Sequence, residues 1–60
     1  MKKKIRVLIA DENLDLRTML SDSLEKEKDF QVIGLASDGE ETIQKAILLT
    51  PDVIVLNSIL

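Results

Sequence analysis

The stretch Ile5-Arg6-Val7-Leu8-Ile9-Ala10, with Asp11 and Glu12 directly behind it, decides the fold of this chain. Apart from Arg6 the run is apolar, and it is rich in β-branched residues. A run of this length and composition is typical of a strand that is covered on both faces. We therefore predict a buried strand over residues 5–10 with two carboxylates at its end.

A helix is predicted after this strand, because the apolar residues change from a continuous run to a helical repeat. It extends from Asn13 to about Lys28, and Asn13 is suited to the N-cap position. The residues expected on its inner face are Leu16, Met19, Leu20, Ser23 and Leu24.

Residues 30–36 predict a second strand, in which Gly34 indicates a bulge or a close packing contact. A second helix follows and ends at Pro51. Its outer side carries an i, i+4 pair formed by Glu41 and Lys45. The residues expected on its inner stripe are Ile43, Ala46, Ile47 and Thr50.

Strands and helices alternate along the chain, and a third apolar strand is predicted over residues 53–56. This order predicts an α/β fold with a parallel sheet and right-handed crossovers. Doubly wound domains of this kind usually contain about five or six strands. We therefore expect residues 1–60 to form the N-terminal half of a domain, or a half-domain that completes itself by association.

The composition excludes several classes of function. The chain contains no Cys and no His, which rules out disulfides, zinc sites of the Cys/His type and catalytic triads built on those residues. The net charge of −3 offers no broad basic surface for nucleic acid or an acidic membrane. The apolar stretch near the N-terminus is too short for a signal peptide or a membrane span, so we expect a cytoplasmic protein.

Candidate ligands for a metal ion lie at the ends of two strands. Asp11 and Glu12 end the first strand, and Asn57 ends the third. If these strands are neighbours, two carboxylates and an amide oxygen surround one small pocket, which suits a hard cation such as Mg²⁺. In the alternative interpretation, the two acids only favour the start of the following helix. A phosphate-binding loop is not expected, because the first strand-to-helix turn contains no glycine.

Three segments match a known family: KIRVLIADEN at residues 4–13, VIGLASDGEE at residues 32–41 and PDVIVLN at residues 51–57. Together they resemble receiver domains of bacterial two-component response regulators, in particular the N-terminal receivers of LuxR-type or sporulation-type DNA-binding regulators. The resemblance implies a flavodoxin-like sheet with the strand order 2-1-3-4-5. This chain would supply the part with the order 2-1-3.

The resemblance also implies roles for individual residues. Asp11 and Glu12 match the acidic pair that holds Mg²⁺, and the backbone carbonyl of Ile59 matches the third protein ligand. Asn57 occupies the position of the phosphoacceptor Asp. Because an amide lacks the carboxylate nucleophile, we expect no phosphorylation, no enzymatic activity and only weak Mg²⁺ binding, with the Asn57 oxygen as a further ligand.

The expected function is that of a truncated or degenerate receiver domain. Its parent protein would receive phosphate from a sensor histidine kinase and regulate transcription through a separate DNA-binding region. The alternative is a natural or engineered half-flavodoxin module that only self-associates, as a homo-oligomer joined through the third strand. A phosphatase with a strand-end Asp nucleophile would require an acid two residues after Asp11, where this chain has Asn13.

Overall fold

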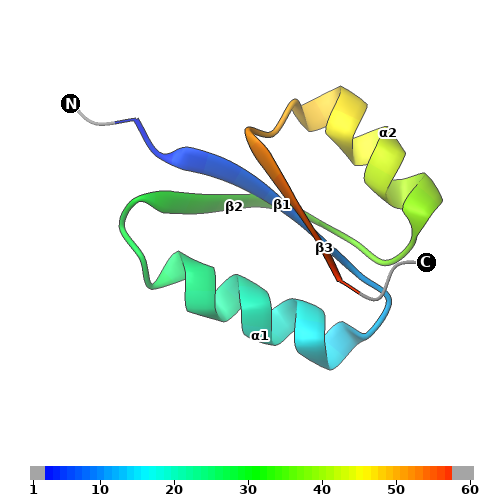
Figure 1. Ribbon diagram of the computed structural model, residues 1–60, viewed down its shortest axis with the longest axis horizontal. Coiled ribbons are helices and arrows are strands. Elements are labelled where there is room, and N and C mark those ends of the chain that lie inside the picture. Colours follow the sequence, from blue (N-terminus) through cyan, green and yellow to red (C-terminus); the bar gives the residue numbers. More distant parts are fainter. Residues whose placement is uncertain (1–2, 58–60) are drawn as a thin grey trace.

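The chain folds into a three-stranded parallel sheet with two crossover helices. The computed structural model describes residues 3–57. The strands lie in the order β2-β1-β3, which confirms the predicted fold class and strand order (Figure 1). The elements are β1 (Ile5–Asp11), α1 (Leu14–Glu25), β2 (Phe30–Ala36), α2 (Gly39–Leu49) and β3 (Val53–Asn57).

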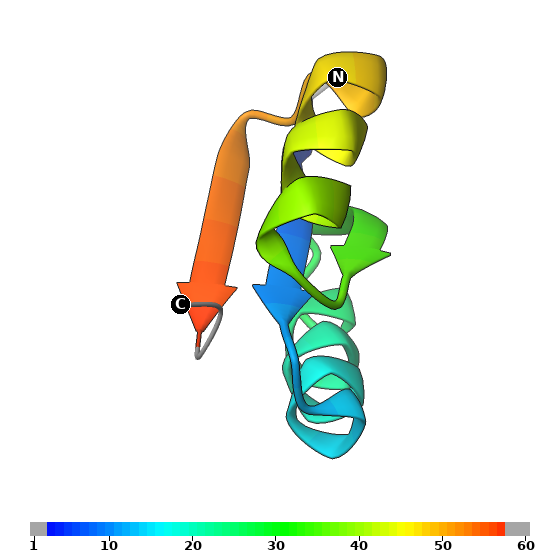
Figure 2. The ribbon, with the colours of Figure 1, turned by 90° about the vertical axis from the view of Figure 1, so that its right-hand side faces the viewer.

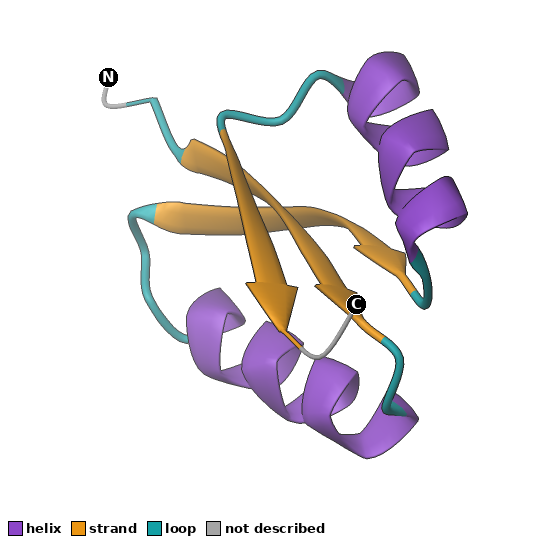
Figure 3. Ribbon diagram, turned by 45° about the vertical axis from the view of Figure 1, so that its right-hand side comes forward, coloured by secondary structure: helices purple, strands orange, loops and turns teal. Residues whose placement is uncertain are grey.

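The two helices lie on opposite faces of the sheet (Figure 3). Leu8 of β1 packs beside Gly34 and Leu49, so its side chain faces α2. At the end of β1, Arg17 of α1 donates to the backbone carbonyl of Asp11 and so links that helix to the strand.

The core is centred on β1, which is the middle strand. Its residues Val7, Leu8, Ile9 and Ala10 are buried, together with Ala36 at the end of β2. A strand with a neighbour on each side and a helix on each face loses nearly all its contact with water. This confirms a strand covered on both faces over residues 7–10, whereas Ile5 at its start is exposed, and it concentrates the hydrophobic stabilisation in one short segment.

β3 is an edge strand, and its side chains are only partly covered. The helices pack mainly on β1 and β2, and β3 stands apart from both of them in Figure 2. Three of its four apolar residues are exposed, namely Val53, Ile54 and Leu56. This strand therefore leaves apolar surface in water at the edge of the described sheet.

The first helix begins as predicted and ends earlier. The Asn13 side chain accepts a hydrogen bond from the Leu16 N–H at 3.0 Å, so Asn13 is the N-cap. The helix ends at Glu25, and the expected extension to Lys28 is wrong. Residues 25–29 are all charged, so this segment offers no apolar side chain that would hold another turn against the sheet.

The predicted inner faces of the helices are only partly confirmed. In α1 the three expected leucines are half-buried, but Met19 and Ser23 are exposed, and Arg17 and Ser21 are half-buried in their place. In α2 the expected Ala46 is half-buried, but Ile43, Ile47 and Thr50 are exposed, and Ile47 keeps 74% of its surface in water. The residues that α2 directs inward are Thr42, Lys45, Ala46 and Leu49.

Gly34 explains the orientation of α2. A Cβ atom at this position would lie 2.8 Å from Leu49 Cδ1 and 3.2 Å from Leu8 Cδ1. The absence of a side chain therefore lets Leu49 approach β2 closely. The β1–β2 register also shifts between Val7 and Leu8, opposite this part of β2. The predicted bulge and the predicted close contact are both confirmed.

Arg6 fixes the C-terminal end of α2 and the start of β3. Its Nη1 and Nη2 atoms donate to the carbonyls of Thr50 and Leu49, each at 2.7 Å. A guanidinium at a helix C-terminus satisfies free carbonyls and interacts favourably with the helix dipole. The Arg6 backbone also forms two hydrogen bonds of 2.8 Å with Asp52, one to its carboxylate and one from its N–H. The amino end of β3 is thereby tied to β1.

The N-terminus of α2 contains a carboxylate with an altered pKa. Glu41 accepts hydrogen bonds from the Ser37 N–H at 2.6 Å and the Ser37 hydroxyl at 2.9 Å. Its predicted pairing with Lys45 is confirmed, with an N···O distance of 3.2 Å, but the pair is half-buried and does not lie on the outer side as expected. The Ser37 N–H contributes most, and together these partners lower the pKa of Glu41 from 4.5 to about 2. The ionised carboxylate is therefore favoured in the folded chain.

We expect acid to weaken the folded state through Glu41. A group whose pKa is lower in the folded state stabilises the fold above its unfolded pKa and loses this effect as it is protonated. The loss should occur as the pH falls from about 4.5 towards 2. Urea unfolding at several pH values measures it. Glu41→Gln should flatten the dependence in this range, whereas Ser37→Ala should keep most of it because the backbone N–H remains. An unchanged pH dependence in Glu41→Gln would contradict the assignment.

Candidate functional site at the carboxyl ends of β1 and β3

The last residues of β1 and β3 face each other across the sheet. Asp11 pairs with Asn57 in the β1–β3 register. The Asn57 Nδ2 atom donates a hydrogen bond of 2.7 Å to Asp11 Oδ2. An ionised carboxylate can only accept hydrogen bonds, so the amide must direct its nitrogen rather than its oxygen towards Asp11.

Asp11 is fully buried, with 0% of its surface exposed. Its second carboxylate oxygen, Oδ1, accepts a hydrogen bond of 2.9 Å from the Asn13 N–H in the turn that leads into α1. The Arg17 guanidinium donates to the Asp11 carbonyl at 2.7 Å. A buried carboxylate is tolerated only where donors replace water, and the two donors to this carboxylate come from β3 and from the turn before α1.

The structure brings together only part of the predicted ligand set. Asp11 and Asn57 meet, as the parallel arrangement of their strands required. Glu12 is exposed to solvent, one residue beyond the end of β1. The predicted carbonyl ligand, Ile59, lies outside the described residues.

The described residues fit a resident divalent cation poorly. Residues 3–57 contain no cluster of three or more acidic, His or Cys side chains that could hold a metal ion. Both oxygens of Asp11 already accept hydrogen bonds from protein donors. Within the same range, no buried side-chain oxygen or nitrogen lacks a partner. A cation would require Asn57 to rotate its amide so that Oδ1 replaces Nδ2 beside Asp11.

The alternative interpretation of the acidic pair is partly correct. Asp11 does order the entry to α1, through its bond to Asn13, but its other oxygen bonds to a residue of the third strand. Arg17 is a part of this site that the sequence analysis missed. Helical spacing placed it on the outer face, but its side chain is long enough to reach back to the end of β1.

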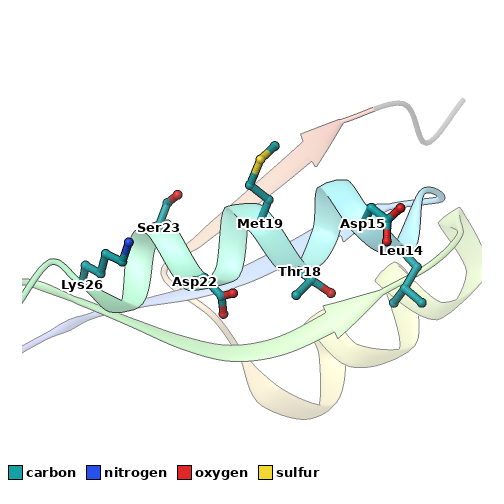
Figure 4. A pocket seen from close by; sticks show the side chains of 7 residues that line it. All are labelled: Leu14, Asp15, Thr18, Met19, Asp22, Ser23 and Lys26. Atoms are coloured by element: carbon teal, nitrogen blue, oxygen red, sulfur yellow. The ribbon is translucent and has the colours of Figure 1, made fainter.

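A shallow hollow lies along the surface of α1 (Figure 4). All its lining residues belong to this helix or the residue that caps it, so it has no second wall of its own. It includes the exposed Met19 and Ser23 side chains that were expected to pack inward. The lining residues are Leu14, Asp15, Thr18, Met19, Asp22, Ser23 and Lys26. Within residues 3–57, no helix has the length and apolar character of a membrane span.

Comparison with known proteins identifies relatives over nearly the whole chain. No family model matches the sequence. The chain is 53% identical over 57 residues to a protein-glutamate methylesterase/protein-glutamine glutaminase of Caldanaerobacter subterraneus, a match that covers 95% of the chain and 16% of the relative. It is 51% identical over 53 residues to the protein of the same name from Bacillus subtilis, covering 88% of the chain and 15% of the relative. The chain therefore spans about one sixth of the length of these relatives.

A solved structure shows the same fold at similar identity. The response regulator domain of Thermotoga maritima CheB matches with a TM-score of 0.85 and 44% sequence identity. The match covers 87% of the chain and 39% of that domain structure.

These matches correct one prediction and support another. The relatives carry the names of enzymes, so the expected likeness to LuxR-type or sporulation-type DNA-binding regulators, and with it the link to transcription, is not supported. The resemblance to two-component receivers is supported, because the matched structure is a response regulator domain. The chain is therefore similar in sequence and fold to part of a response regulator domain.

Proposed function

We propose that the chain is the receiver portion of a methylesterase-type chemotaxis regulator and that, with Asn57 at the acceptor position, it does not take up phosphate. Under this proposal the chain has no catalytic activity of its own, and any enzymatic activity belongs to parts of the parent protein outside the matched region. A sensor histidine kinase is the phosphorelay partner of the parent, in the cytoplasm.

One observation carries this proposal. Asn57 lies at the carboxyl edge of the sheet, where its amide contacts the buried carboxylate of Asp11. Ligand sites of open α/β sheets lie at this edge. Transfer of a phosphoryl group to this position requires a carboxylate oxygen that attacks the phosphorus and displaces the donor's leaving group, and a neutral amide does not supply such a nucleophile. Any Mg²⁺ binding is therefore weak, because one of the charges that would attract the cation is missing.

We expect incubation with acetyl phosphate and Mg²⁺ to leave the intact mass of the chain unchanged. Asn57→Asp is the matched variant, because it restores a carboxylate of the same size, and any labelling should be confined to it. A phosphate found on Asp11 or Glu12 of the unsubstituted 60-residue chain would contradict the proposal. Asn57 precedes Ser58, a small residue that favours slow deamidation, so the unlabelled mass must be recorded on the same sample.

A second candidate function is self-association through β3, and the difference between the two sheet edges favours it. On β2, the Lys45 ammonium donates to the Leu35 carbonyl at 2.5 Å, so one backbone acceptor of that strand is covered by charge. β3 has no charged residue between Val53 and Leu56, and its apolar side chains are partly exposed. Charged residues discourage pairing at an edge, whereas an apolar edge invites it. The proposed partner is a second copy of the chain.

A further inference from the structure

We propose that the Asn57 amide takes the place of a divalent cation at this strand edge, so that the ends of β1 and β3 are held together without metal. This goes beyond the proposed function, because a receiver that accepts no phosphate can still depend on Mg²⁺ for its structure. It follows from hydrogen bonds of Asp11 and not from the identity of the relatives.

Protein donors bind both carboxylate oxygens of Asp11. A buried carboxylate needs positive or donor groups around it, which a cation or protein N–H groups can supply. Here Oδ1 is bound by the Asn13 N–H and Oδ2 by the Asn57 amide, at 2.9 and 2.7 Å. The Arg17 guanidinium adds positive charge at the carbonyl of the same residue. Each carboxylate oxygen therefore has a protein donor.

Hydrogen bonds join β3 to β1 at both of its ends. β3 is joined to β1 at its amino end by the two bonds between Arg6 and Asp52. The Asn57 to Asp11 bond joins the same strands at the opposite end. The backbone pairing with β1 holds β3 along its length, and because the helices leave this strand largely uncovered, the hydrogen bonds at its two ends add to what fixes it (Figure 2).

A carboxylate at position 57 would remove the donor that Asp11 has there. In Asn57→Asp an oxygen replaces the donor nitrogen, so two ionised carboxylates face each other at hydrogen-bond distance. They repel each other in the absence of a cation, and Mg²⁺ between them relieves the repulsion. One isosteric change therefore converts a metal-independent edge into a metal-dependent one.

The test measures thermal unfolding by circular dichroism, with EDTA or with millimolar MgCl₂. It compares the unsubstituted chain, called the parent chain from here on, with the variants Asn57→Asp and Asn57→Ala. The parent should unfold at the same temperature in both buffers, within about 1 °C. Asn57→Ala should unfold about 10 °C lower in both, because it leaves a buried carboxylate oxygen without its donor. Asn57→Asp should unfold at least about 10 °C lower in EDTA and recover most of this loss with Mg²⁺. Gln44→Glu is the control, since it makes the same amide-to-carboxylate change on exposed α2.

A second measurement covers variants that do not fold. In ¹⁵N-labelled parent chain, the side-chain NH₂ resonances of Asn57 should stay in place during Mg²⁺ titration, and Mn²⁺ should not broaden them saturably. A saturable shift or broadening would overturn the proposal, because the amide would then yield to the cation. A parent chain that is unfolded in EDTA, or Asn57→Ala as stable as the parent, would also overturn it.

Discussion

Replacing Leu8 by alanine should remove a large share of the stability of the folded chain. Leu8 lies in the central strand with 0% of its surface exposed. It packs beside Gly34 and Leu49, so the helix on that face cannot easily move in to fill the space. Truncating a buried leucine costs about 2–5 kcal/mol, and a 60-residue domain has roughly 3–9 kcal/mol of stability in total. The loss is therefore comparable to the whole stability of the fold.

Urea unfolding followed by circular dichroism measures this effect. Leu48→Ala is the matched control, because it makes the same chemical change on α2 at a side chain that is 80% exposed. It should change the free energy of unfolding by no more than about 0.5 kcal/mol. Equal destabilisation by the two substitutions would mean that β1 is not the core of the molecule in solution.

A part of the fold could be predicted from sequence where its hydrophobic pattern is compatible with only one structure. The run of β1 has one reasonable interpretation, because a continuous apolar strand must be covered on both faces. The inner faces of the helices were less well determined. In α2, both Ile43 and Leu49 belong to apolar stripes, and the absence of a side chain at Gly34 decides which of them packs. That decision depends on a contact between elements, which spacing within one helix does not contain.

The candidate site divides in the same way. Asp11 and Asn57 could be placed together from sequence, because parallel neighbouring strands end at the same edge. The direction of the Asn57 amide and the reach of Arg17 could not, since both depend on side-chain geometry at the strand ends. The expected link to transcription failed for a different reason. One receiver fold is attached to many output functions, so its core sequence carries little information about the rest of the parent protein.

We expect the chain to self-associate through β3. The parent chain should sediment as a dimer or larger oligomer that dissociates on dilution, and Ile54→Lys should raise the dissociation constant by at least about 10-fold. Ile54 is 40% exposed, so pairing would bury further apolar surface, and a two-fold interface contains the change twice. It is a better probe than the half-buried Val55, which pairs with Ile9 of the core strand and whose replacement also threatens folding.

Sedimentation equilibrium over a range of concentrations provides the measurement, and Ile47→Lys provides the control. Ile47 is also an exposed isoleucine, but it lies on α2 and not on the open edge. If β3 is the interface, the Ile47→Lys chain associates like the parent, because the strand edge is unchanged. Dissociation by Ile47→Lys but not by Ile54→Lys would place the contact on the helix face instead. A folded parent that stays monomeric at every concentration would show that this edge tolerates water without a partner, because its exposed apolar side chains are too few to offset the entropy of association.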